Sequence, residues 1–179
     1  MIGTGYVGLV SGTCFSDLGN KVYCVDKDSK KISKLNSGIS PIYEPGLDEL
    51  IKKNYNSGRL IFTNNLKEGV CNADIIFICV GTPNKKSSNE VDLKYVYAAV
   101  REVSMYANNK KIIVTKSTVP VGTGDEIEKI LKKNKKSKIE VISNPEFLRE
   151  GEAIRDFRFP DRIVIGSNNK KKYDIFKKL

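Results

Sequence analysis

The sequence predicts an α/β fold in which a doubly wound parallel sheet carries helices on both faces. Short runs rich in β-branched residues alternate along the 179 residues with amphipathic segments of helical period. The runs are almost continuously apolar, which is typical of parallel strands buried on both faces. A glycine-rich stretch, "GTGYVG", opens the first helical segment. A chain of this length buries one ordinary hydrophobic core, so we expect a single domain.

Six segments are predicted strands, and each is bounded by turn residues. They are "KVYCVD" (21–26), "RLIFT" (59–63), "ADIIFICVG" (73–81), "KIIVTKST" (111–118), "IEVIS" (139–143) and "RIVIG" (162–166). Five helices are predicted between them, at residues 6–18, 30–36, 46–55, 92–107 and 123–134. The final "KKKYDIFKKL" resembles the beginning of a further helix. Right-handed crossovers would place these helices on both faces of one sheet.

The chain is basic, with 31 Lys and Arg against 21 Asp and Glu, a formal net charge of +10. Many lysines occur in runs, at Lys110–Lys111, Lys132–Lys133, Lys135–Lys136 and Lys170–Lys172. Because the runs fall at predicted helix ends and loops, we interpret them as a solvated surface rather than a nucleic-acid site. No apolar run approaches the roughly 20 residues of a membrane span, and no signal peptide is recognisable. We therefore expect a cytoplasmic protein with neither nucleic acid nor membrane as a partner.

Cysteine and histidine usage limits the chemistry. The four cysteines, Cys14, Cys24, Cys71 and Cys79, have no C-x-x-C spacing, and we expect reduced core residues. The chain contains no histidine, which excludes His-based triads and His metal sites, and we expect no metal. Acid–base chemistry would have to come from carboxylates, lysines, thiols or bound water.

The pattern G-x-G-x-x-G is formed by Gly3, Gly5 and Gly8. In a Rossmann-type dinucleotide-binding domain the first glycine permits a tight turn, and the second lets the backbone approach a pyrophosphate at the helix N-terminus. The third lets helix and strand pack closely. Only Met1 and Ile2 precede the motif, so the first strand is largely missing. That strand would be the central member of the sheet, and we expect residues 1–179 alone to fold poorly.

The residues after the motif agree with dinucleotide binding. Gly19 is expected to cap the first helix, and Asp26 ends the strand that follows. A carboxylate at this spacing accepts hydrogen bonds from the hydroxyls of the adenosine ribose. It would repel a 2′-phosphate, so NAD is favoured over NADP, although Lys27 and Lys31 weaken that preference. The alternative is that Asp26 only begins a turn.

Five stretches together resemble the UDP-glucose/GDP-mannose dehydrogenase family. They are "GTGYVGLVSGTCFSDLGNKVYCVDKD", "KISKLNSGISPIYEPGLDEL", "CVGTP", "KSTVPVGT" and "NPEFLREGEAIRDFRFPDRIVIG", in the family's order along nearly the whole chain. "PIYEPGL", "KSTVPVGT" and "NPEFLREG" together are specific, whereas a lone G-x-G-x-x-G is not. The resemblance implies NAD as cofactor, UDP-glucose as substrate and a homo-oligomer of at least two copies. A UDP-N-acetyl sugar or GDP-mannose is the alternative substrate.

The resemblance also assigns site residues. Cofactor contacts are implied for Gly3, Thr4, Gly5, Tyr6, Val7, Gly8, Asp26, Lys31, Val80, Gly81, Thr82, Pro83, Ser117, Thr118 and Glu150. Thr118 would also help to hold a catalytic water. Without the family context, an ordinary strand-ending turn at 80–83 and a satisfied strand-end hydroxyl at 117–118 would look the same.

The segment "NPEFLRE" (144–150) is the most informative chemically. Asn144 and Pro145 predict a helix N-cap and first helical position, which would put Glu146 and Glu150 on one helical face. Two carboxylates there could simply complement the helix dipole. By resemblance, Glu146 is the acid/base acting through water and Glu150 supports it near the cofactor, so the implied catalytic set is Thr118, Glu146 and Glu150. The implied nucleotide-sugar pocket is lined by Glu146, Phe147, Leu148, Arg149 and Glu150.

The reaction implied by the resemblance is a four-electron oxidation of the sugar C6 alcohol to a carboxylate, giving UDP-glucuronate with two NAD. It passes through a thioester on a cysteine thiolate, which the family carries in a segment of the form G-G-S-C-F-P-K-D. Residues 1–179 contain no such segment. We therefore expect an NAD-binding domain cut at both ends, without the central helix and substrate domain, and inactive alone. A non-catalytic dinucleotide-binding module is the alternative, and a nucleic-acid-binding protein has only the charge in its favour.

Overall fold

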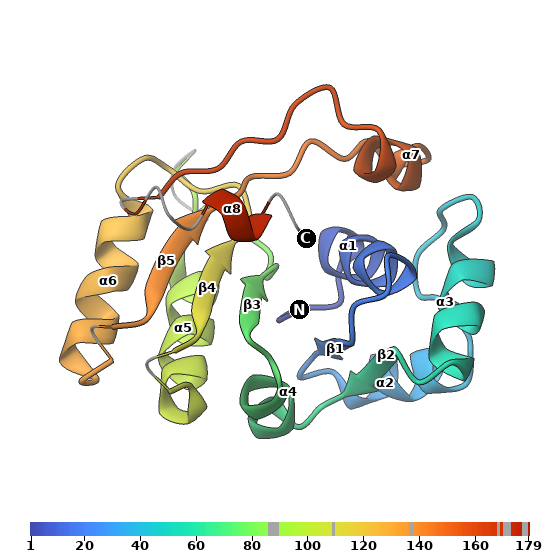
Figure 1. Ribbon diagram of the computed structural model, residues 1–179, viewed down its shortest axis with the longest axis horizontal. Helices are drawn as coiled ribbons and strands as arrows, with labels where there is room; N and C mark the ends of the chain where they lie inside the picture. The colour runs from blue at the N-terminus through green and yellow to red at the C-terminus, as the bar shows by residue number, and fades with distance from the viewer. Residues whose placement is uncertain (86–89, 109, 137, 168, 170–172, 177–178) are drawn as a thin grey trace.

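The computed structural model describes residues 1–85, 90–108, 110–136, 138–167, 169, 173–176 and 179. Its strands are β1 (Val22–Val25), β2 (Leu60–Thr63), β3 (Ile75–Ile78), β4 (Ile112–Thr115) and β5 (Glu140–Ser143). β1 pairs with β2, and β3, β4 and β5 pair in that order, all in parallel. Helices lie on both sides of this layer (Figure 1). The predicted doubly wound parallel sheet is confirmed.

Residues 1–3 fill the gap between β1 and β3. The Ile2 N–H donates to the Phe77 carbonyl, and the Ile2 carbonyl accepts from the Cys79 N–H, both at 2.8 Å. On the other side, the Val25 N–H donates to the Met1 carbonyl and the Val25 carbonyl accepts from the Gly3 N–H, both at 2.8 Å. Ile2 thus forms a parallel bridge to each neighbouring strand. The first strand is as short as the sequence predicts, yet it occupies its central place and joins the two halves of the sheet.

Alternate side chains of the strands feed two apolar cores, one on each face. Phe77 packs with the first core, together with buried residues of α1, α2 and α3, whereas Ile76 and Ile78 pack with buried residues of α5 and α6 in the second. This period of two follows from the pleat of each strand. The helices are α1 (Tyr6–Asp17), α2 (Ser29–Asn36), α3 (Leu47–Asn56), α4 (Leu66–Asn72), α5 (Lys94–Tyr106), α6 (Thr123–Lys133), α7 (Ala153–Arg158) and α8 (Tyr173–Phe176).

The five predicted helices are confirmed with ends displaced by at most two residues, whereas α4 is not predicted. Asn65 caps α4, its side chain accepting from the Glu68 N–H at 3.2 Å. Gly69 is needed in the helix interior, because a Cβ there would lie 2.5 Å from the Val25 side chain. A glycine in so short a segment hides the helical pattern from the sequence, although it is the residue that lets α4 approach β1. Gly19 lies one residue beyond the C-cap of α1, in the left-handed conformation with φ +100°.

The predicted strand at 162–166 is wrong. Only Gly166 pairs with the sheet, through two 2.8 Å hydrogen bonds to Ser143 that form an antiparallel bridge. Two of the three β-branched residues before it are exposed, Ile163 at 67% and Val164 at 42%, whereas Ile165 is half-buried against the first core. This segment returns across the end of the sheet instead of extending it.

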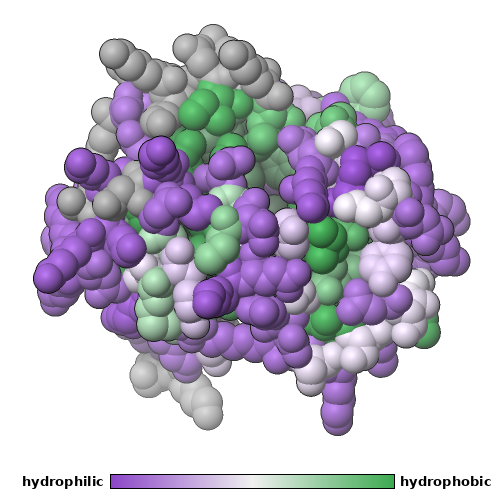
Figure 2. All heavy atoms as spheres, turned by 60° about the horizontal axis from the view of Figure 1, so that its bottom comes forward, coloured by the Kyte–Doolittle hydropathy of each residue, from purple (hydrophilic) through white to green (hydrophobic). Residues whose placement is uncertain are grey.

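The surface and the cysteines depart from expectation at two positions. Hydrophilic side chains cover most of the face seen in Figure 2, with hydrophobic patches between them. Lys111, however, is buried, and its ammonium donates to the carbonyls of Cys71 and Ala73 at 3.1 and 2.5 Å.

All four cysteines are free and three are buried, but Cys71 is exposed, so the core prediction is wrong for it. Residues 170–172 lie outside the described part. Within the described residues, no helix has the length and apolar character to cross a membrane.

Candidate functional site

The candidate site lies at the carboxyl ends of the parallel strands. After β5 the chain crosses this edge towards α1, forms α7 beside it, and returns to the Gly166 bridge (Figure 1). Ligands of open α/β sheets bind in the crevice outside this edge. The predicted cofactor and substrate segments therefore meet on one side of the molecule.

The three motif glycines differ in the space around them. Gly3 has φ +101°, and a Cβ on it would lie 2.8 Å from the Cys79 carbonyl oxygen. A Cβ on Gly8 would lie 1.9 Å from the Gly3 carbonyl oxygen, so only glycine lets α1 begin so close to the first strand. A Cβ on Gly5 would meet nothing within 4 Å. Gly5 is also the N-cap of α1 and provides no capping side chain, which leaves the first N–H groups of this helix available to an anion.

Asp26 follows β1 and is held by four hydrogen bonds. Its Oδ2 accepts from the Thr4 N–H at 2.8 Å, the Thr4 hydroxyl at 2.7 Å and the Lys31 ammonium at 3.2 Å. Its Oδ1 accepts from the Asp28 N–H at 3.0 Å. Burial raises the pKa of the Asp26 carboxyl, but these hydrogen bonds outweigh it and bring the pKa below its usual value. The carboxylate is thus charged and oriented, and Oδ1 retains acceptor capacity for a diol.

Ser117 ties the ends of β3 and β4 together. Its side chain is buried, and its hydroxyl donates to the Val80 carbonyl at 2.7 Å. Its N–H donates to the Ile78 carbonyl at 3.2 Å. Thr118 follows and is exposed, as are Gly81 and Pro83, whereas Thr82 is half-buried. The Ser117 hydroxyl therefore shapes the loop at 80–83, and Thr118 offers its hydroxyl at the strand edge.

The helix predicted at 144–150 is wrong. The Asn144 N–H donates to the Thr115 carbonyl at 2.9 Å and continues the ladder of β5, so Asn144 is not an N-cap. Residues 144–149 are in neither a helix nor a strand, and α7 begins only at Ala153. Glu146 is half-buried and accepts from the Leu148 N–H at 2.5 Å, while Glu150 is exposed. The two carboxylates do not share a helical face.

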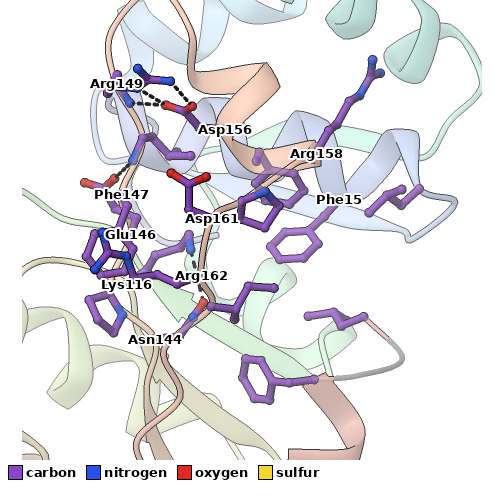
Figure 3. A pocket seen from close by; sticks show the side chains of 18 residues that line it. Phe15, Lys116, Asn144, Glu146, Phe147, Arg149, Asp156, Arg158, Asp161 and Arg162 are labelled. Carbon is purple, nitrogen blue, oxygen red and sulfur yellow. Dashed lines mark hydrogen bonds and ion pairs between the residues drawn. The ribbon is translucent and has the colours of Figure 1, made fainter.

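A cavity of about 490 Å³ opens between α1, α7 and the returning chain (Figure 3). Its lining includes Glu146, Phe147, Leu148 and Arg149 of the predicted sugar pocket, but not Glu150. Arg149 is held by Asp156 through guanidinium contacts of 2.7 and 3.0 Å. These contacts lower the pKa of the Asp156 carboxyl to about 2. The structure thus brings four of the five predicted substrate residues into one cavity.

Lys116 is a cavity residue that sequence reasoning did not select. Its side chain is buried, and its ammonium donates to the Asn144 side-chain oxygen at 3.2 Å (Figure 3). Burial lowers the pKa of Lys116, while the neighbouring Cys79 and Glu146 act in the opposite direction. A lysine inside a predicted buried strand was the signal available, because such a side chain needs polar partners at the strand end.

Tyr6 and Glu44 join the motif helix to the start of α7. The Tyr6 hydroxyl donates to Glu44 Oε2 and lies 3.2 Å from the Arg149 carbonyl oxygen. Glu44 is only 6% exposed. The side chain of Tyr6 is thus engaged by protein groups, and Glu44 is a second residue that the sequence did not single out. Among the described residues, no group of three or more His, Cys, Asp or Glu could hold a metal ion.

Comparison with known proteins decides the family. A family model described as the UDP-glucose/GDP-mannose dehydrogenase family, NAD binding domain, matches residues 1–179. The chain belongs to this family. The predicted resemblance and the NAD cofactor are confirmed at this level.

Relatives and solved structures agree with this assignment. UDP-glucose 6-dehydrogenase of Rhizobium meliloti (strain 1021) is 58% identical over 93% of the chain and 38% of the relative. UDP-glucose 6-dehydrogenase TuaD of Bacillus subtilis (strain 168) is 51% identical over 100% of the chain and 39% of the relative. A ternary complex of Pseudomonas aeruginosa GDP-mannose dehydrogenase has a TM-score of 0.93 at 39% identity, covering 99% of the chain and 42% of that structure. The chain spans about two fifths of the length of the curated relatives it matches.

Proposed function

We propose that the chain is the NAD-binding part of a longer cytoplasmic enzyme that oxidises UDP-glucose to UDP-glucuronate and acts as a homo-oligomer of at least two copies. The observation that carries the proposal is that Asp26 is bonded to Thr4 beside the start of the motif helix, while α1 also borders the cavity that contains Glu146. The curated relatives at 51–58% identity are named UDP-glucose 6-dehydrogenases, which favours UDP-glucose over GDP-mannose.

The residues at the edge fit an NAD molecule. The open space at Gly5 and the uncapped N-terminus of α1 suit the pyrophosphate, and the oriented Asp26 suits the ribose diol. Bound NAD supplies a hydride acceptor. The chain's own contribution is to place that acceptor next to the cavity and to exclude the 2′-phosphate of NADP by charge.

Glu146 is the residue best placed for acid–base work on the sugar alcohol. It is half-buried in the cavity, and Lys116 with Asn144 provides a fixed polar wall beside it. Removing the hydroxyl proton as hydride leaves requires a base within reach directly or through one water. We assign this role to Glu146, with the Thr118 hydroxyl orienting the water and Glu150 supporting the cofactor side.

The chain does not supply the cysteine nucleophile of this reaction. Burial raises the pKa of Cys14 and Cys79 to about 12 and that of Cys24 to about 11, whereas a nucleophilic thiolate needs a lowered value. Cys71 is exposed on α4, outside the cavity lining. By itself the chain therefore acts as a dinucleotide-binding module, and turnover belongs to the longer protein.

Two assays test the proposal. Calorimetry should show NAD binding to the longer protein, which should reduce two NAD per UDP-glucose while the chain alone reduces none. GDP-mannose and UDP-N-acetylmannosamine serve as competing substrates in the same assay. If either one is oxidised faster than UDP-glucose, that sugar nucleotide is the substrate instead. An absence of NAD binding would overturn the proposal entirely.

A further inference from the structure

Glu44 is a buried carboxylate whose partners all come from distant parts of the chain. Its Oε2 accepts from the Gly151 N–H at 2.8 Å and from the Tyr6 hydroxyl. Its Oε1 accepts from the Ala153 N–H at 2.8 Å and the Ile154 N–H at 3.4 Å. Both oxygens are thus used by two donors each, across sequence separations of up to 110 residues.

The Glu44 carboxylate caps the N-terminus of α7. Glu152, the N-cap residue of that helix, makes no capping hydrogen bond with its side chain. Glu44 instead satisfies N–H groups that the helix start leaves free, and its negative charge lies at the positive end of the dipole. The position of the first turn of α7 therefore depends on the loop that carries Glu44.

Tyr6 connects this cap to the cofactor helix. It is the first residue of α1, directly after the uncapped N-terminus at Gly5. Its hydroxyl oxygen accepts from the Gly151 N–H at 3.1 Å while donating to Glu44. Burial and the Glu44 carboxylate raise the pKa of Tyr6 far above its usual value, so the phenol remains a neutral donor.

Hydrogen bonds hold the backbone on both sides of Glu150. The carbonyl of Arg149 and the N–H of Gly151 both contact the Tyr6 hydroxyl. On the outer side, Asp156 accepts from the Arg149 N–H and guanidinium at 2.7 to 3.0 Å. The backbone on both sides of Glu150 is thereby tied to α1 and to α7, although the Glu150 side chain itself is exposed.

We propose that the Tyr6–Glu44 bridge couples NAD binding at the N-terminus of α1 to the placement of residues 149–153, so that a bound cofactor orders the Glu150 backbone. Tyr6 and Glu44 are positioning residues in this scheme. The role of Glu150 rests on the proposed function, whereas the coupling itself is a property of NAD binding. Because thermodynamic coupling is reciprocal, weakening the bridge must also weaken NAD binding.

Tyr6→Phe separates coupling from simple stabilisation, since Glu44 keeps its N–H partners at Gly151 and in the first turn of α7 while the link to α1 is lost. We expect NAD to bind about 5-fold or more weakly to this variant, a typical size for coupling between sites. Hydrogen–deuterium exchange of a peptide covering 149–155 should slow on NAD addition in the wild-type protein, and this slowing should be lost in Tyr6→Phe. Tyr43→Phe, at an 87% exposed tyrosine of the same loop as Glu44, is the matched control and should behave as wild type.

Glu44→Gln provides the second variant. A neutral amide presents one acceptor oxygen instead of two, so we expect faster exchange at 149–155 even without NAD. Wild-type NAD affinity together with wild-type NAD-dependent slowing in Tyr6→Phe would overturn the coupling. That result leaves the proposed function intact, whereas normal coupling in a longer protein that fails to oxidise UDP-glucose would overturn the proposed function alone.

Discussion

The two faces of the sheet differ in the side chains that they bury and in their distance from the cavity. The face covered by α5 and α6 packs an apolar core that includes the fully buried Val100, Val103, Ile113 and Ile127. Ser104 of α5 and Thr123 of α6 are buried as well, and both hydroxyls donate to nearby backbone carbonyls. The face covered by α1 also buries polar side chains such as Thr4, Ser11 and Glu44, and it borders the 490 Å³ cavity. We infer that the α5–α6 face supplies stability and the α1 face supplies binding. Changes on the two faces should therefore affect different measurements.

The largest effect is expected from a truncation in the apolar face. Ile127 of α6 is fully buried, and Ile127→Ala should lower the free energy of unfolding by about 2 to 5 kcal/mol, as large-to-alanine core changes do. At temperatures where the variant is folded, its NAD affinity should equal that of the wild type. Urea unfolding and calorimetry measure the two quantities. Ile39→Ala, at a 58% exposed isoleucine, is the control, and weakened NAD binding in Ile127→Ala would contradict the division between the faces.

The next effect concerns the cavity. In the longer protein, Glu146→Gln keeps the shape and one acceptor oxygen but removes the base, so turnover of UDP-glucose should fall by roughly 10²-fold or more. Thermal unfolding should change little, because Glu146 is only half-buried. Glu152→Gln, an exposed carboxylate in the same segment, should leave turnover unchanged. Near-normal turnover in Glu146→Gln would return this carboxylate to a purely local role, the hydrogen bond to the Leu148 N–H.

The sequence predicted the repeating parts of both faces well, because period and turn signals are local. The bounds of β1, β2 and α6 follow to within one residue from their own sequences, and the close contact at Gly8 follows from the motif. The segment at 144–150 failed because its conformation is decided from elsewhere. The N–H of Asn144 completes a strand ladder, and the cap of α7 comes from Glu44, more than 100 residues away.

Cavity residues were predictable in part for the same reason. Glu146 to Arg149 were found through a resemblance in one continuous segment, and they do lie together. Lys116 and Glu44 were not selected, because a charged residue beside a strand or in a loop resembles a surface residue until its burial is known. Lys111 shows the same ambiguity. It belongs to a pair of lysines just before β4, yet its side chain is buried.

A smaller effect is expected at Asp26, the proposed contact to the ribose diol of NAD on the α1 face. Asp26→Asn should weaken NAD binding by about 10-fold, which corresponds to roughly 1.4 kcal/mol for a lost charge-assisted hydrogen bond. The affinity for NADP should change less, because the repulsion of a 2′-phosphate is relieved at the same time. Calorimetric titration with both cofactors measures the ratio, and Asp48→Asn on the exposed side of α3 is the control. An unchanged ratio would mean that Lys31, at 3.2 Å from Asp26, already neutralises the carboxylate.

The smallest effect is expected at Cys71, the cysteine that neither core contains. Its side chain is exposed on α4, so Cys71→Ala should change the free energy of unfolding by no more than about 0.5 kcal/mol. Iodoacetamide at pH 8 should label Cys71 in the native protein and leave Cys14, Cys24 and Cys79 unlabelled. Burial raises the pKa of those three thiols to between about 11 and 12, so they stay protonated as well as inaccessible at this pH. Intact-mass measurement should therefore show one adduct in the wild type and none in Cys71→Ala. A second adduct on Cys79 would show that the carboxyl edge near Lys116 opens to solvent, and the α1 face would then be less rigid than its hydrogen bonds indicate.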